Sequence, residues 1–211
     1  MDDPQAAEHL QVIRTIMERA ALYRRALAPI SITAGVLGGI AAASGWFAGL
    51  DAARSFTSFW LAVGAATLAA SLFIVRRQAL QADEPFWSPP ARRIAQAMMP
   101  ALVVGLLAGL MVLLPGASNS RAAWWLPGVW MVLYGCATHA AGFFLHRGIR
   151  VFAAVFIASG ALVLLYVNAR LSAGDLPALR FAHVVMGAAF GGLHLAYGVY
   201  LAATERSVPP A

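Results

Sequence analysis

Lysine is absent from this chain of 211 residues, and charge of either sign is scarce. Only 11% of the residues are charged, whereas a soluble domain carries about a quarter. The hydrophobic fraction is 61%, and its residues are concentrated in long runs. This composition excludes an ordinary soluble domain and favours a protein that lies in a lipid bilayer.

The chain also lacks residues that several kinds of site require. Cys136 is the only cysteine, so neither an intrachain disulfide nor a site with several thiolate ligands can form. All nine acidic residues stand outside the apolar runs, which disfavours transport driven by protons or sodium, because such transport uses a carboxylate within the membrane. The motifs of serine and zinc hydrolases are missing as well. We therefore expect a protein that is not an enzyme.

Six apolar runs are each close to the length that crosses a bilayer as a helix, which is about 20 residues. They lie at 29–50, 56–75, 94–114, 122–145, 151–168 and 178–203. Helices are expected because backbone polar groups in lipid must bond within their own segment. The predicted fold is all-α, a polytopic bundle of six transmembrane helices in one domain at 29–203, followed by a cytoplasmic tail at 204–211.

The distribution of arginine predicts the orientation of the bundle. With the N-terminus inside, eleven arginines fall on the inner side, and the other four, Arg54, Arg121, Arg170 and Arg180, fall on the outer side. The positive-inside rule therefore places both termini in the cytoplasm. The charges stand at the ends of apolar runs, where they meet lipid headgroups, so we expect the lipid bilayer and not nucleic acid as their partner.

Residues 1–28 precede the first run and contain a predicted amphipathic helix at 6–27. Leu10, Ile13 and Met17 recur on one side of this helix, and charged residues cover the rest. We favour a juxtamembrane helix that lies on the inner lipid surface. The alternative is a docking helix for a cytoplasmic or membrane protein partner.

Small residues form stripes on several predicted helices, a pattern that allows close helix packing in lipid. The predicted packing positions are Gly35, Gly39, Gly135, Gly142, Gly187, Gly191 and Gly198. Histidines share two of these stripes, with His139 in the fourth run and His194 in the sixth. His183 is expected near the outer membrane surface and is given no role.

Three interpretations of His139 and His194 stay open. We favour a polar network, in which each ring forms a hydrogen bond to a neighbouring helix. The second is a haem b ligated by both rings, which would make the protein an electron carrier. The third is a copper or zinc site that includes Cys136, which lies three residues before His139 on the same helix face. No fourth ligand is evident, so the metal is unknown.

Four segments carry a resemblance to known sequences: IRTIMERA at 13–20, ISITAGVLGGIAA at 30–42, LPGVWMVLYGC at 126–136 and FGGLHLAYGVYLA at 190–202. They resemble an uncharacterised family of small bacterial multi-helix membrane proteins, whose members are often encoded beside a winged-helix regulator. The resemblance implies a regulated component of the bacterial cytoplasmic (inner) membrane, such as a sensor or an envelope-stress protein. The amphipathic segment, the small-residue helix faces and the lack of catalytic motifs favour a non-enzymatic sensor or partner-binding component. Only His194 matches the family pattern among the histidines. Small-molecule transport is a further alternative.

Overall fold

The computed structural model describes residues 27–81, 83, 85–116, 119–145 and 148–205. Almost all of the predicted amphipathic helix at 6–27 and most of the tail at 204–211 lie outside the described residues. The described part of the chain is built from helices and short connections, so the prediction of an all-α helical bundle is confirmed.

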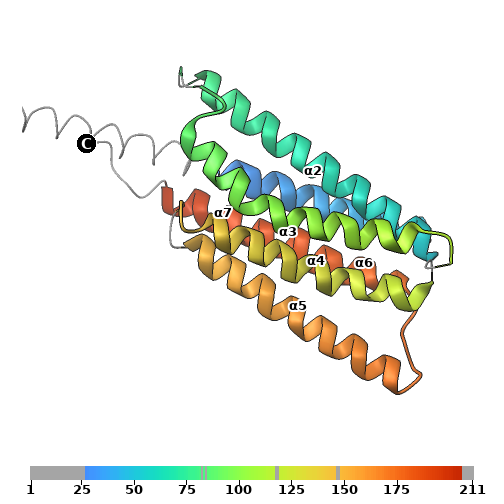
Figure 1. The fold of residues 1–211 in the computed structure, drawn as a ribbon. Helices are drawn as coiled ribbons and strands as arrows, with labels where there is room; N and C mark the ends of the chain where they lie inside the picture. The colour runs from blue at the N-terminus through green and yellow to red at the C-terminus, as the bar shows by residue number, and fades with distance from the viewer. Residues whose placement is uncertain (1–26, 82, 84, 117–118, 146–147, 206–211) are drawn as a thin grey trace, which may run out of the picture.

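Consecutive helices run antiparallel along the bundle (Figure 1). The first described helix, Leu27–Phe47, is drawn in blue. It is followed by α2 (Ala53–Gln81), α3 (Pro89–Leu113), α4 (Ser120–Ala141) and α5 (Gly148–Ser172). The last helix is one rod in three parts, α6 (Arg180–Met186), the π-helix η1 (Gly187–Leu193) and α7 (His194–Glu205).

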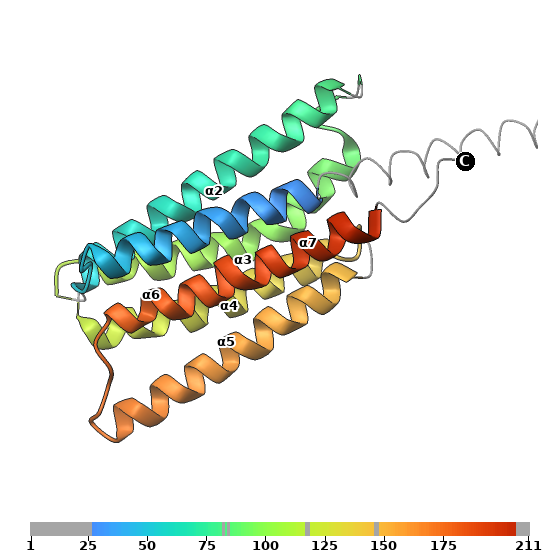
Figure 2. The ribbon, with the colours of Figure 1, turned by 180° about the vertical axis from the view of Figure 1, so that it is seen from behind.

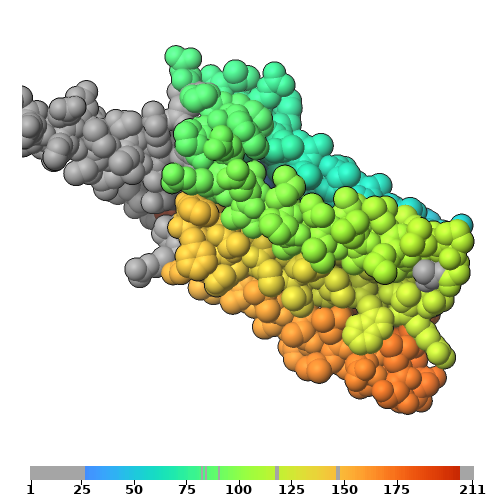
Figure 3. Space-filling model, in the orientation of Figure 1, coloured from blue at the N-terminus to red at the C-terminus, as the bar shows by residue number. Residues whose placement is uncertain are grey.

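The bundle has two faces. Figure 1 shows α3 and α4 on one face with α5 at the edge, and Figure 3 shows that the side chains of these three helices form a continuous surface. Figure 2 shows the first and the last helix side by side on the opposite face. α2 and α5 occupy opposite edges of the bundle (Figures 1 and 2).

Five of the described helices are long and apolar enough to cross a membrane, which supports a multi-pass membrane protein. The exception is α4, whose Trp, Tyr, His and Pro residues lower its hydropathy. This helix is also the most enclosed, since only Ser120, Arg121 and Cys136 along its length are exposed. A helix covered by α3 and α5 needs less apolar surface than one that faces lipid.

Several helix bounds differ from the predicted runs, and most of these helices are longer because they continue through polar residues at their ends. The fifth helix was expected at 151–168 and extends over Gly148–Ser172. The second was expected at 56–75 and extends over Ala53–Gln81. The first ends at Phe47, since Gly49 has a positive φ of 62° and turns the chain. The third begins earlier than expected, with Pro89 in its first turn, where a missing backbone N–H removes no helix hydrogen bond.

The first and last helices pack backbone to backbone along a row of glycines, here called the glycine seam. Its members are Gly35, Gly38, Gly45, Gly187, Gly191 and Gly198. A Cβ atom added at Gly191 would lie 2.9 Å from the backbone nitrogen of Gly39, and one at Gly38 would lie 2.7 Å from the carbonyl of Phe190. A larger residue at Gly38 or Gly191 would therefore force the two helices apart.

A second close contact joins α4 to α5. Gly128 and Gly135 on α4 and Gly142 at its C-terminal end recur at every seventh residue, and Gly160 of α5 lies opposite Gly128. A Cβ atom at Gly135 would lie 2.9 Å from the carbonyl oxygen of Ala153, and one at Gly160 would lie 2.9 Å from that of Gly128. Without side chains at these positions, the two helices bring their backbones into contact over most of their length.

We predict that Gly135→Leu lowers the free energy of unfolding by about 1–3 kcal/mol, because the added side chain meets the backbone of α5. The same change at Gly64 is the matched control, since a Cβ atom there has no neighbour within 4 Å. Both variants would be unfolded with denaturant in detergent micelles. Equal stability of the two variants would contradict the packing described for α4 and α5.

Candidate functional site

The last helix changes its winding just before its second buried histidine. Residues Gly187–Leu193, with the sequence GAAFGGL, form a π-helix, and His194 begins the α-helix that follows. Such segments usually span a single turn and occur often at functional sites. Three glycines in seven residues favour this unusual backbone, because glycine has the widest conformational freedom. We therefore take the surroundings of His194 as the candidate site.

The ring of His194 is enclosed by aromatic side chains from three helices. The ring is 4% exposed, and its centroid lies 5.2 Å from that of Tyr134, 5.1 Å from Phe152 and 5.3 Å from Phe156. Phe190 of η1 stacks on it at 6.1 Å. The cage thus draws together α4, α5 and the last helix around one imidazole.

One hydrogen bond fixes the His194 ring within this cage. Its Nε2 lies 2.8 Å from the hydroxyl oxygen of Tyr134. The carbonyls of Ala189 and Phe190 approach the ring, although Nδ1 makes no contact with full hydrogen-bond geometry among the described residues. The tautomer that agrees with these contacts carries its proton on Nδ1, toward the two carbonyls. Tyr134 therefore donates its O–H to Nε2. This bond joins α4 to α7.

A second buried histidine, His183, joins three segments at one end of the bundle. Its Nδ1 lies 3.0 Å from the indole nitrogen of Trp60 on α2, and its Nε2 lies 3.3 Å from the carbonyl oxygen of Leu50. Since an indole N–H can only donate, Nδ1 accepts this bond and Nε2 carries the proton that is donated to Leu50. The fully buried ring also packs against Gly45, where no side chain occupies the space.

The sequence gives little sign of this role of His183. The expected position near the end of a span agrees with its place at the start of the last helix, but its partner Trp60 is 123 residues away. Only the stripe of small residues that it shares with Gly187 and Gly191 hinted at a buried ring.

The structure places His139 and Cys136 away from His194. His139 is half-buried, and its ring contacts Phe143 at 5.7 Å, whereas the thiol of Cys136 is exposed. At about 100° per residue, these residues lie about 140° and 160° around α4 from Tyr134, the residue that meets His194. No group of three potential metal ligands occurs among the described residues. The proposed three-ligand site of Cys136, His139 and His194 is therefore not formed.

The surroundings of His194 also bear on haem ligation. Its Nε2 is bonded to Tyr134, and aromatic rings of Phe152, Phe156 and Phe190 surround the imidazole. The ring contacts of His139 and His194 have no residue in common. Ligation of haem iron by the Nε2 of His194 would require Tyr134 to leave.

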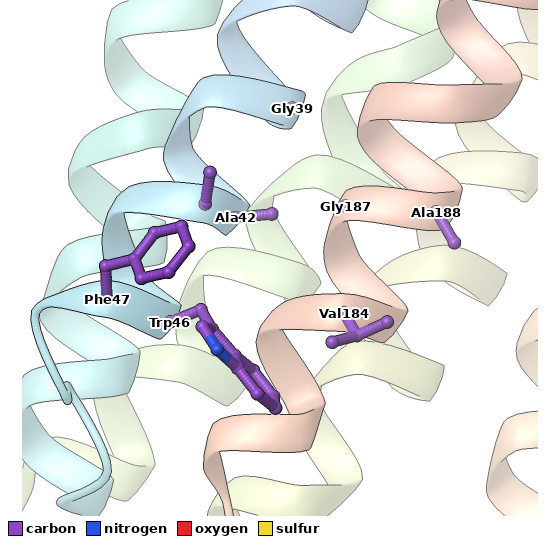
Figure 4. A pocket seen from close by; sticks show the side chains of 8 residues that line it. Gly39, Ala42, Trp46, Phe47, Val184, Gly187 and Ala188 are labelled. Atoms are coloured by element: carbon purple, nitrogen blue, oxygen red, sulfur yellow. The ribbon is translucent and has the colours of Figure 1, made fainter.

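An open apolar groove of about 440 Å³ lies between the first helix and the start of the last (Figure 4). It is lined by small residues at one end and larger apolar residues at the other: Gly39, Ala42, Ala43, Trp46, Phe47, Val184, Gly187 and Ala188. Gly39 therefore differs from the other predicted packing positions. Its backbone contacts Gly191, but a Cβ atom on it would meet nothing within 4 Å.

Comparison with known proteins gives no match, since no family model, curated protein or solved structure is significantly similar to this chain.

We predict that Trp60→Phe lowers the free energy of unfolding by about 1–2 kcal/mol, because it leaves the buried Nδ1 of His183 without a donor. Trp87→Phe is the matched control, because Trp87 is 58% exposed. Its effect should stay within about 0.5 kcal/mol. Denaturant unfolding in micelles measures both. A loss that is equal in the two variants would show that the Trp60–His183 bond contributes nothing.

Proposed function

We propose that the protein is a six-span component of the bacterial cytoplasmic membrane, with both termini in the cytoplasm, and that it acts as a non-enzymatic sensor or partner-binding subunit. Five apolar helices and the excess of arginine on one side support the membrane topology. The enclosed position of α4 supports its assignment as the sixth span. The resemblance to a family encoded beside regulators agrees with this role.

The observation that carries the proposal is the direct contact between the first helix and the π-helical part of the last. Gly191 of η1 meets the backbone of Gly38 and Gly39. The described part of the first helix starts at Leu27, the last residue of the predicted amphipathic segment 6–27. A displacement of the last helix therefore acts on a helix that leads directly into the segment available for a partner.

The π-helix supplies the element that switching requires, a segment with two discrete arrangements. Conversion of Gly187–Leu193 between π and α winding shifts the residues that follow relative to those that precede. Shifts of about 1–2 Å between packed helices are a common form of signal transmission. In this proposal, winding in η1 sets the position of the first helix, and the segment 6–27 reports it to a partner.

The buried histidines serve this role as tethers. His183 ties the last helix to Trp60 of α2, and His194 ties it to Tyr134 of α4. The two tethers flank η1, so a change in winding must act between them. The contacts of His194 support the polar network, whereas the Nδ1 of His139 has no hydrogen bond among the described residues. Haem binding and transport stay predictions from the sequence.

We predict that Gly191→Ala changes the contacts of the N-terminal segment in native membranes. A photo-crosslinking residue would replace Arg14 in the full chain, and crosslinked proteins would be separated and quantified. The Cβ atom at residue 191 displaces the first helix, so the yield of a specific crosslink should change about twofold or more, as for a coupling of about 0.5–2 kcal/mol.

Gly192→Ala is the matched control, because it makes the same change one residue later in η1, where the nearest atom is 3.9 Å away. Gly35→Ala disturbs the same seam from the first helix and should reproduce the effect of Gly191→Ala. The proposal fails if Arg14 crosslinks to no protein, or if seam and control variants give the same yields while all remain folded.

A further inference from the structure

We propose that the groove between the first helix and α6–η1 binds one anionic phospholipid, with an acyl chain in the groove and the phosphate on Arg180. This site does not depend on the proposed sensor role. We infer the occupant from the residues along the groove, which are cationic at one end and apolar along the rest.

The apolar part is an open groove that is long enough for a stretch of an acyl chain. Trp46 and Val184 stand at one end, and Gly39 and Ala188 lie further along, as Figure 4 shows. From residue 46 to residue 39 the helix rises about 10 Å, which lies within one leaflet of a hydrocarbon core about 30 Å thick. The small residues on both helices leave the space that a lipid chain would fill.

The cationic end is held in place by stacking. Arg180 is the first residue of α6, and the centre of its guanidinium lies 4.1 Å from the ring centroid of Trp46. The Trp46 ring packs edge-on against Phe181 at 5.3 Å, which fixes its orientation. Stacking occupies a face of the guanidinium and leaves its N–H donors in the plane of the group. Arg180 therefore presents hydrogen-bond donors beside the groove.

One of these donors is buried without a partner. The Nε of Arg180 has no hydrogen bond among the described residues, although the atom is inaccessible to solvent. Guanidinium groups bind phosphate through paired N–H donors, so a phosphate would bind the terminal donors of Arg180, and a small rotation of the side chain would let one oxygen also accept from Nε. Asp175, in the loop before α6, is engaged by Arg170 at 2.7 Å. The charge of Arg180 is thus available to a ligand from outside the chain.

The interfacial position completes the match to a phospholipid. Arg180 stands at the start of a membrane-length helix, where lipid phosphates lie, and the groove runs from there toward the membrane interior. A phospholipid carries its phosphate and its acyl chains in this order. A soluble anion would use Arg180 but leave the groove empty.

Native mass spectrometry of the full chain in mild detergent tests this site. The probes are dioleoyl phosphatidylglycerol and dioleoyl phosphatidylcholine, which differ only in headgroup. The wild-type protein should prefer the anionic lipid about fivefold, the attraction expected of one basic residue. Arg180→Gln should abolish this preference, and Arg180→Lys should keep most of it. Arg54→Gln removes an exposed arginine from the same end and should change nothing.

Gly39→Leu tests the groove independently, because a side chain there enters open space without meeting the protein backbone. It should weaken the binding of both lipids. An unchanged preference in Arg180→Gln would overturn the proposal. The proposal would also be overturned by a combination of two results. Inorganic phosphate would bind the protein only when Arg180 is present, and Gly39→Leu would leave lipid binding intact. Loss of a dimer in Gly39→Leu, with lipid binding unchanged, would assign the groove to a second copy of the chain and equally overturn it.

Discussion

Backbone contact between helices is the constraint on which the rest of this structure depends. In lipid, helices gain nothing from hiding apolar side chains, so their association relies on close packing and a few polar bonds. Glycine permits the closest approach, and here it does so twice. Gly38 and Gly191 bring the first and last helices together, while Gly135 and Gly160 do the same for α4 and α5.

Both buried histidines occupy positions that these contacts create. The ring of His183 packs against Gly45, where any side chain would collide with it, and it can then reach Trp60 and Leu50. The cage of His194 needs α4 and α5 side by side, because Tyr134 comes from one and Phe156 from the other. A polar group at such a position must find a partner within the protein. Close packing therefore comes first, and the hydrogen bonds follow from it.

The sequence was informative wherever one segment alone decides the structure. Long apolar runs are sufficient to predict helices, and glycine stripes pointed to residues such as Gly35 and Gly191 that meet a neighbouring backbone. Gly38 and Gly160 were overlooked, because their importance depends on which helix lies opposite. The enclosure of α4 also results from its neighbours, and its lower hydropathy only becomes understandable in the bundle.

The candidate site was harder to predict, because its key features depend on pairs of distant residues and on an unusual backbone. Residues three or four apart share a face in an α-helix, so a pattern with this spacing gives no sign of the π-helix at Gly187–Leu193. The small-residue stripes associated His139 with His194, whereas the ring of His194 meets Tyr134, on another side of α4. The bond from Trp60 to His183 has no local signature at all.

The groove and the glycine seam are formed by the same two helices, and this has a physical consequence. Gly187 lines the groove, and a Cβ atom added to it would lie 2.5 Å from that of Ala42, which lines the groove as well. A molecule in the groove therefore contacts residues whose spacing is set by the seam. In the proposed exchange of η1 between π and α winding, a molecule that binds one winding more tightly shifts the populations toward it. The size of this shift is limited by the difference between the two binding free energies. Coupling of this kind is reciprocal, so a partner held by the N-terminal segment would alter the affinity of the groove by the same factor.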